Sequence, residues 1–235
     1  MVKPDVLVVN PVCMDSPLWR KVIRDNRDKF SKVISVSYND HRSLEFLDFY
    51  KSVTKDFTHV DIGEITFRDW RDQCVNAGIK EVTSDWILFM EQDFLPGEGF
   101  WEGVLDEAED YDVVGYGDMG KWSEDVRLHP SFLLVRTAIV KSTRMDFGAY
   151  PDFNRDHFAV FTEELFKMKN LRFLDISKYN WEHLKGLYSN YMLVLAGGKP
   201  NYEVARFKQY VIDAMNADVV HDERFLDWSR KCLED

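Results

Sequence analysis

The sequence predicts an α/β fold with a mostly parallel central sheet and helices on both faces of that sheet. Short, unbroken apolar runs, such as 6–10 and 86–90, are typical of strands that are covered on both sides. Between these runs, apolar residues recur at helical spacing, as they do over 17–30. Strands that alternate with helices in this way favour βαβ units, in which successive strands run parallel.

The same patterns place the elements along the chain. Strands are expected at 6–10, 33–38, 57–62, 86–90, 111–116, 131–136 and 171–176, and helices at 17–30, 44–50, 67–78, 100–108, 162–168 and 202–215. A glycine-containing loop is expected at 117–123, and an irregular aromatic segment at 149–161. The residues 187–235 are expected to form a helical extension that packs on the main domain.

Composition excludes several classes of protein. The chain of 235 residues has 30 Lys and Arg against 41 Asp and Glu, a net charge of -11, and no basic run of the kind that nucleic acids require. Its three cysteines are far apart, so neither a disulfide framework nor a zinc site is indicated, and a reducing cytoplasm is expected. No apolar run approaches the roughly 20 residues of a membrane span, and no signal peptide is expected. Peripheral membrane association stays open.

An acidic pair follows the apolar run 86–90. Glu91 and Asp93 are separated by Gln92, and this spacing in an extended chain points both carboxylates to the same side. Ligands of parallel sheets gather at the carboxyl ends of strands, where two carboxylates can hold a divalent cation. The alternative is that these acids only lead the strand into solvent.

The segment upstream makes the pattern more specific. Asn76-Ala77-Gly78-Ile79, a short turn, and an apolar strand that closes on Glu91 and Asp93 resemble the nucleotide-sugar-binding half of glycosyltransferases with the A-type fold, especially the inverting family 2 enzymes. In that family the strand closes on Asp-x-Asp, so Glu91 departs from the pattern. The resemblance follows the order of elements over about 5–186. It implies a glycosyltransferase domain at 1–186, with a donor half at about 1–95 and an acceptor half at about 96–186.

Donor-binding roles are also implied by the resemblance. Asp93, together with His183 and Glu91, would hold Mn²⁺ or Mg²⁺ on a nucleoside-diphosphate sugar, with a UDP-sugar favoured over a GDP-sugar. Asp40, at the end of the second strand, would bind the nucleotide base, and Arg71 would bind the diphosphate or the base. The alternatives are an Asx turn at Asp40, a surface ion pair at Arg71 and a purely structural His183.

Three further candidate residues complete the expected site. Asn10 ends the first strand and is expected to face the same ligand. Thr162-Glu163-Glu164 resembles the family's Thr-Glu-Asp block, whose last acid is the catalytic base. This match implies that Glu164 is the base, with Glu163 as its neighbouring alternative. Ordinary chemistry of a helix N-terminus would also explain a Thr followed by two acids.

The resemblance therefore implies a metal-dependent glycosyltransferase of hexosyltransferase type, acting with inversion on a carbohydrate or glycoconjugate acceptor. A sugar-phosphate nucleotidyltransferase is the first alternative. Those enzymes carry a glycine-rich, basic loop after the first strand, whereas 10–16 contains neither glycine nor a base. A non-catalytic protein that binds nucleotides or carbohydrates on the same fold is the second alternative.

Overall fold

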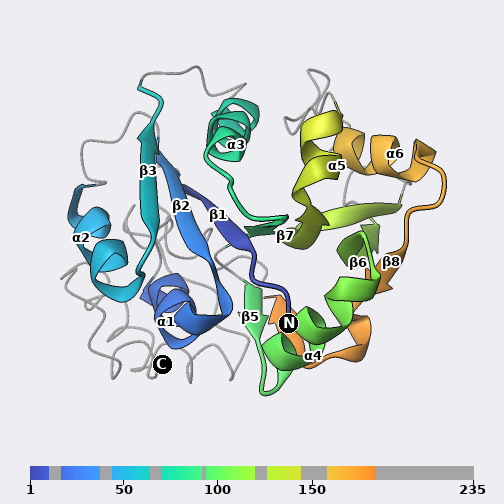
Figure 1. Cartoon of the computed structure of the whole chain (residues 1–235), viewed down its shortest axis with the longest axis horizontal. Coiled ribbons are helices and arrows are strands. Elements are labelled where there is room, and N and C mark those ends of the chain that lie inside the picture. Colours follow the sequence, from blue (N-terminus) through green and yellow to red (C-terminus); the bar gives the residue numbers. More distant parts are fainter. Residues whose placement is uncertain are drawn as a thin grey trace, which may run out of the picture.

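A seven-stranded sheet forms the centre of the molecule, with the strand order β3-β2-β1-β4-β7-β6-β8 (Figure 1). The computed structural model describes residues 1–10, 17–37, 44–63, 70–91, 94–119, 126–143 and 158–183. The strands of this sheet are β1 (Asp5–Asn10), β2 (Lys32–Ser37), β3 (Phe57–Asp61), β4 (Trp86–Met90), β6 (Val113–Met119), β7 (Val126–Arg136) and β8 (Phe173–Asp175). Two shorter strands, β5 (Phe94–Pro96) and β9 (Trp181–His183), form a separate antiparallel pair.

Strand direction confirms the expectation of a mostly parallel sheet. β1, β2, β3 and β4 are parallel neighbours, and β8 is parallel to β6. β7 lies between β4 and β6 and runs antiparallel to both. The amino end of β7 therefore lies at the same edge of the sheet as the carboxyl ends of β1 to β4.

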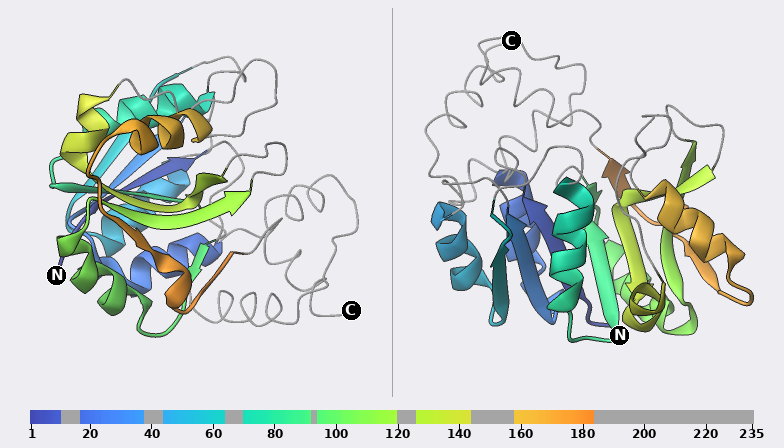
Figure 2. Two further views of the ribbon diagram at one scale, coloured as in Figure 1. Left: turned by 90° about the vertical axis from the view of Figure 1, so that its right-hand side faces the viewer. Right: turned by 90° about the horizontal axis from the view of Figure 1, so that it is seen from above.

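Helices cover both faces of the sheet, as the left view of Figure 2 shows. The helices are α1 (Pro17–Asp25), α2 (Leu44–Val53), α3 (Trp70–Lys80), α4 (Phe100–Glu107), α5 (Thr137–Ser142) and α6 (Ala159–Lys167), with 3₁₀ turns η1 (Arg27–Lys29), η2 (Ala108–Asp110) and η3 (Ile176–Lys178). Residues of α1, α2 and α4 share one hydrophobic cluster, and residues of α3, α5 and α6 share the other.

Alternation along the strands explains why two cores form. In β1 and β4, Val6 and Leu88 belong to the first cluster, whereas Leu7, Ile87 and Phe89 belong to the second. Successive side chains of a strand point to opposite faces, so a strand that is buried on both faces needs apolar residues at every position. The unbroken apolar runs in the sequence reflect this requirement.

The start of β1 is joined to the turn before β4 through a buried carboxylate. Oδ2 of Asp5, which is fully buried, accepts hydrogen bonds from the backbone N–H groups of Thr83 (2.7 Å) and Ser84 (3.1 Å). The Ser84 hydroxyl in turn accepts from the backbone N–H of Asp5 at 2.9 Å. Burying a polar group is costly unless it is hydrogen-bonded, so these bonds hold the start of β1 against the turn before β4.

Several expected boundaries are wrong. β7 begins at Val126, five residues before the expected start, and β6 continues to Met119, through the first part of the expected loop. α6 begins at Ala159, so Thr162 does not open that helix. α1 ends at Asp25, and β5 and β9 were not expected.

Other expectations lie outside the described residues. These are the helical extension at 187–235, the end of the expected loop at 120–123, and the segment 149–157. No helix in the described ranges is long and apolar enough to cross a membrane.

Candidate functional site

The carboxyl ends of the parallel strands meet at one edge of the sheet. Asn10, the last residue of β1, pairs with Ser37 at the end of β2, and Ser37 pairs with Asp61 at the end of β3. β4 ends at Met90, so Glu91 leaves the sheet at this edge. This is where the sequence placed Asn10 and Glu91.

Glu91 is half-buried, and its backbone is fixed on both sides. Its N–H donates to the carbonyl oxygen of Ser131 at 3.0 Å, and its own carbonyl oxygen accepts from the N–H of Phe94 at 3.3 Å. Glu91 and Phe94 are therefore held close to each other by a backbone hydrogen bond. Asp93 lies between these two residues in the sequence but outside the described residues.

The small β5–β9 ladder brings a distant segment of the chain next to Phe94. Phe94, which follows Asp93 in the sequence, pairs with His183 of β9. The rings of Phe94 and Trp181 stack at 5.3 Å, and the N–H of Gly97 donates to the carbonyl oxygen of Asn180 at 2.9 Å. The side chain of His183 is not among the described ones, but its backbone lies opposite the residue next to Asp93.

A buried polar network lies directly behind Glu91, and the sequence did not reveal it. The hydroxyls of Tyr116 and Ser131 are 2.6 Å apart, and the Ser131 N–H donates to Nδ1 of His129 at 3.1 Å. The His129 ring stacks on that of Tyr116 at 5.1 Å. Since Ser131 also binds the backbone of Glu91, the network fixes where the first acid leaves the sheet.

The helix that carries Glu163 and Glu164 is anchored to the amino end of β7. Thr162 is buried, and its hydroxyl accepts from the N–H of Leu128 at 3.1 Å and donates to the carbonyl oxygen of Phe158 at 2.8 Å. Glu163 and Glu164 are partly exposed, and Glu164 forms an ion pair with Lys167 at 2.5 Å. Thr162 therefore acts inside the helix and not as its N-cap, which weakens the helix-terminus explanation of this block.

Comparisons with solved structures identify the fold. S. aureus TarS is similar over 94% of this chain and 44% of that chain, with 14% identity and a TM-score of 0.55. The mannosyltransferase PcManGT from Pyrobaculum calidifontis, in complex with GDP-Man and Mn²⁺, is similar over 100% of this chain and 75% of that chain, with 13% identity and a TM-score of 0.54. The chain has the A-type glycosyltransferase fold.

This fold also occurs in enzymes that transfer nucleotides. The inositol-1-phosphate CTP transferase from T. maritima is similar over 78% of this chain and 90% of that chain, with 9% identity and a TM-score of 0.52. The chain spans less than half the length of the TarS chain. No family model and no curated protein sequence matches this sequence.

In the A-type fold of this chain, α3 brings Arg71 toward the same edge. The end of α3 lies beside the start of β2, where Nζ of Lys32 donates to the carbonyl oxygen of Glu81 at 3.1 Å. The first turn of α3, which contains Arg71, therefore lies toward the carboxyl end of the strands. The Arg71 side chain and the whole of Asp40 are outside the described parts.

The predicted metal ligands are only partly within the described structure. Among the described residues, no three His, Cys, Asp or Glu side chains are grouped closely enough to hold a metal ion. Of the predicted ligands, the structure describes the side chain of Glu91 but not those of Asp93 and His183. The backbone around Glu91, Phe94 and His183 shows only that the two segments with the predicted ligands lie next to each other. The set of metal ligands itself stays a prediction.

Proposed function

We propose that this chain is a metal-dependent glycosyltransferase that moves a sugar from a nucleoside-diphosphate sugar to an acceptor hydroxyl with inversion. The observation that carries the proposal is the pairing of Phe94 with His183 directly after the acidic pair. This ladder joins the two segments that carry the predicted metal ligands. It does so at the edge of the sheet where α/β proteins bind their ligands.

Glu91, Asp93 and His183 are the residues that would hold the metal. They offer two carboxylates and an imidazole, which suit Mn²⁺ and, through the carboxylates, Mg²⁺. A bound ion neutralises the charge that develops on the departing nucleoside diphosphate. The hydrogen bond between the Glu91 N–H and Ser131 supports this role, because it fixes the position of the acidic segment before any ligand arrives.

Glu164 is the proposed general base. Its carboxylate would take the proton from the acceptor hydroxyl as that oxygen forms a bond to the anomeric carbon and the bond from that carbon to the diphosphate oxygen breaks. A single displacement of this kind inverts the anomeric configuration. The anchoring of α6 at Leu128 supports the assignment, because β7 starts at the carboxyl edge.

Asn10, Asp40 and Arg71 are proposed to hold the donor. Asp40 would accept a hydrogen bond from the base, and the guanidinium of Arg71 would bind diphosphate oxygens. Asn10 ends β1 beside Ser37 of β2, at the carboxyl edge of the sheet. We propose a UDP-sugar in preference to a GDP-sugar, and a carbohydrate or glycoconjugate as the acceptor.

A nucleotidyltransferase is the second candidate, because the CTP transferase from T. maritima shares the fold. The two reactions release different products. Sugar transfer releases a nucleoside diphosphate, whereas nucleotidyl transfer to a sugar phosphate releases pyrophosphate. The segment 10–16 argues against the second reaction, because it lacks the glycines and basic residues that would cradle a nucleoside triphosphate.

Product analysis tests the proposal. The protein is incubated with UDP- and GDP-sugars, a panel of sugar acceptors, and Mn²⁺ or EDTA, and the released nucleotide is quantified. We expect release of a nucleoside diphosphate that depends on Mn²⁺ and increases with an acceptor. Pyrophosphate released from a nucleoside triphosphate and a sugar 1-phosphate would support the nucleotidyltransferase instead. Donor binding without turnover would support the non-catalytic protein.

A further inference from the structure

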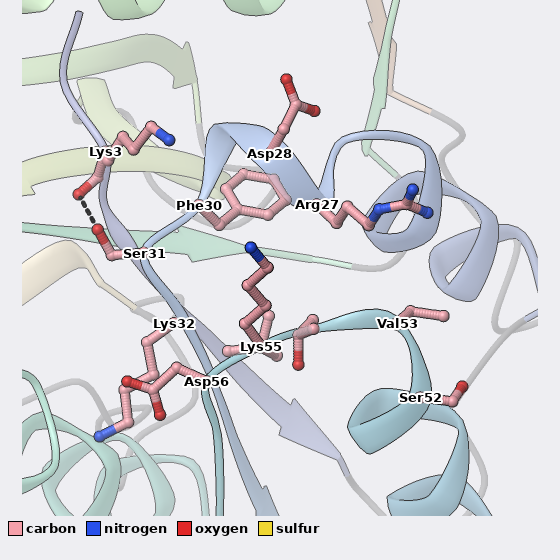
Figure 3. A pocket seen from close by; sticks show the side chains of 12 residues that line it. Lys3, Arg27, Asp28, Phe30, Ser31, Lys32, Ser52, Val53, Lys55 and Asp56 are labelled. Carbon is pink, nitrogen blue, oxygen red and sulfur yellow. Dashed lines mark hydrogen bonds between the residues drawn. The ribbon is translucent and has the colours of Figure 1, made fainter.

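A pocket of about 610 Å³ lies at the amino end of the parallel strands, opposite the candidate site (Figure 3). Its walls come from the residues before β1, the η1 turn, the start of β2, and the turn that joins α2 to β3. The residues that line it are Lys3, Arg27, Asp28, Phe30, Ser31, Lys32, Val33, Ser52, Val53, Thr54, Lys55 and Asp56. Its volume falls within the range of pockets that bind small molecules, about 300 to 1,000 Å³.

The pocket is basic, although the chain is strongly acidic. It has four Lys or Arg residues and two Asp residues in its lining, whereas the chain as a whole has a net charge of -11. Lys3, Arg27 and Lys55 form no side-chain hydrogen bond or ion pair with any residue in the described ranges. Lys32 differs, because its Nζ donates to the carbonyl oxygen of Glu81. Within the described ranges, three cations of the pocket lining therefore have no anionic partner.

The close view shows how these groups are arranged. The ammonium group of Lys55 points into the middle of the pocket, toward the ring of Phe30, which is 7% exposed (Figure 3). The carboxylates of Asp28 and Asp56 point away from that ammonium group on opposite sides. Oδ2 of Asp28 lies 3.4 Å from Nζ of Lys29, which is paired more closely with Oε1 of Glu102 at 2.7 Å. The centre of the pocket therefore favours a negative ligand.

We propose that this pocket binds a small phosphate monoester. Such a group carries a charge of about -1.5 to -2 and has three strong acceptor oxygens, which matches three separate cationic donors better than a single carboxylate does. The organic part of the ligand would contact Phe30 and Val53 of the pocket wall. This site does not depend on the proposed transfer reaction, because it shares no residue with the carboxyl edge of the sheet.

Isothermal titration calorimetry with ribose 5-phosphate tests the proposal, with ribose and inorganic phosphate as comparison ligands. EDTA is present throughout, so that no metal at the opposite edge can hold phosphate. The variants are Lys55→Met and Arg27→Gln, with Lys51→Met as the matched control. Lys51 is an exposed lysine of α2 that does not line the pocket, so this control removes the same charge from the same region. Thermal unfolding without ligand shows that each variant is folded.

We expect saturable binding of ribose 5-phosphate and no binding of ribose. Lys55→Met and Arg27→Gln should each weaken the affinity about tenfold, the usual effect of losing a hydrogen bond to a charged group. Lys51→Met should leave it unchanged. The proposal is overturned if neither ribose 5-phosphate nor inorganic phosphate binds to the wild type. It is also overturned if Lys51→Met weakens binding as much as Lys55→Met does. Sedimentation with phosphatidic acid vesicles tests whether the pocket instead binds the phosphate of a lipid headgroup. A protein that sediments with the vesicles but does not bind ribose 5-phosphate would also overturn the proposal.

Discussion

Thr162 shows how one hydroxyl positions the helix that carries Glu163 and Glu164. Its oxygen accepts a hydrogen bond from Leu128 of β7 and donates one to Phe158, so it connects α6 to the sheet and completes the first turn of the helix. Glu163 and Glu164 follow it directly and project from other sides of the same turn, about 100° apart. Only one of the two carboxylates can readily face a given acceptor.

The first prediction therefore distinguishes the two acids. Glu164→Gln should preserve donor binding, because the amide is nearly isosteric, but lower the transfer rate about a hundredfold or more, the usual contribution of a general base. Transfer rates under saturating donor, together with the anomeric configuration of the product, provide the measurement. Glu163→Gln is the control and should retain transfer. Loss of activity in the control alone would move the assignment to Glu163, and retention of the donor configuration would remove the need for a base here.

A second prediction concerns the metal. Asp93→Asn should abolish Mn²⁺-dependent nucleotide binding while leaving the unfolding midpoint without ligand unchanged, because a strand-end acid contributes little to a hydrophobic core. Calorimetry with UDP in Mn²⁺ and in EDTA gives the answer. Glu91→Gln is the companion variant and reports whether the first acid is also a ligand. Wild-type affinity in Asp93→Asn would contradict the metal assignment.

At the scale of elements, Gly97 controls how closely β5 approaches β9. A Cβ at this position would lie 2.4 Å from Nδ2 of Asn180 and 2.8 Å from the Asn180 carbonyl oxygen, which accepts the Gly97 N–H bond. The backbone atom cannot rotate away as a side chain can. Glycine at position 97 therefore allows the hydrogen bond from its N–H to the Asn180 carbonyl oxygen, and with it the adjacent β5–β9 ladder.

Gly97→Ala should accordingly separate β5 from β9. We expect a loss of about 1 to 3 kcal/mol in the free energy of unfolding, as in other overpacked sites, and weaker Mn²⁺-dependent nucleotide binding. Denaturant unfolding and calorimetry measure the two effects. Gly99→Ala is the control: Gly99 has φ +73° and open space around it, so an alanine there costs about 1 kcal/mol of backbone strain without moving Asn180. Equal loss of metal-dependent binding in both variants would disprove the role of the ladder.

Asp112 joins β6 to β8 and provides a pH-dependent prediction. Burial disfavours its ionised form, but hydrogen bonds from the backbone N–H and guanidinium of Arg172, and the charges of Arg172 and Arg136, together hold the pKa of Asp112 below its ordinary value of 3.8. Because the folded-state pKa is lowered, the stabilisation is present above about pH 4 and is lost as the pH falls through the lowered pKa.

The Asp112→Asn variant should therefore be less stable than the wild type by about 1 kcal/mol near neutral pH, and the difference should shrink in acid. Urea unfolding of both proteins near neutrality and at about pH 3 measures the change. Asp110→Asn serves as the control, since Asp110 is exposed and forms no ion pair with the described residues. A difference between wild type and Asp112→Asn that is constant with pH would contradict this account.

The whole molecule should respond to its donor through linkage. A ligand at about a hundred times its dissociation constant stabilises a folded protein by about 2.7 kcal/mol, which for a chain of this size raises the melting temperature by about 5 to 10 °C. We expect such a shift with UDP and Mn²⁺ together, and a much smaller one with either alone. A full shift with UDP in EDTA would show that donor binding is independent of metal.

The sequence predicted the architecture because each central strand is buried on both faces and therefore has a continuous apolar run. It missed β5 and β9, since three-residue strands that pair over such a distance in the chain leave no local pattern. It also placed the start of β7 too late. Pro130 argues against a strand, but the β6–β7 ladder is irregular between the Gly115–Leu133 and Gly117–Leu128 pairs, where a missing N–H is tolerated.

For the candidate site, the sequence indicated which residues lie at the ends of strands but not which side chains contact one another. Glu91 and Asn10 could be located because strand ends are visible in the sequence, and both lie at the expected edge. The contacts of Tyr116, His129 and Ser131 could not be predicted, because they join different strands through side chains with no characteristic spacing.

The β5–β9 ladder also has a consequence for the order of folding. It closes a loop of about 90 residues, whereas β1 and β2 pair after a single intervening helix. Contacts between residues far apart in sequence carry a larger entropic cost and form later than local ones. Strands β1 to β4 can therefore pair before β9 arrives, and His183 reaches its position opposite Phe94 only at the end. A chain caught before that step would contain most of its sheet and both segments that carry the predicted metal ligands, and we expect it not to bind the ion.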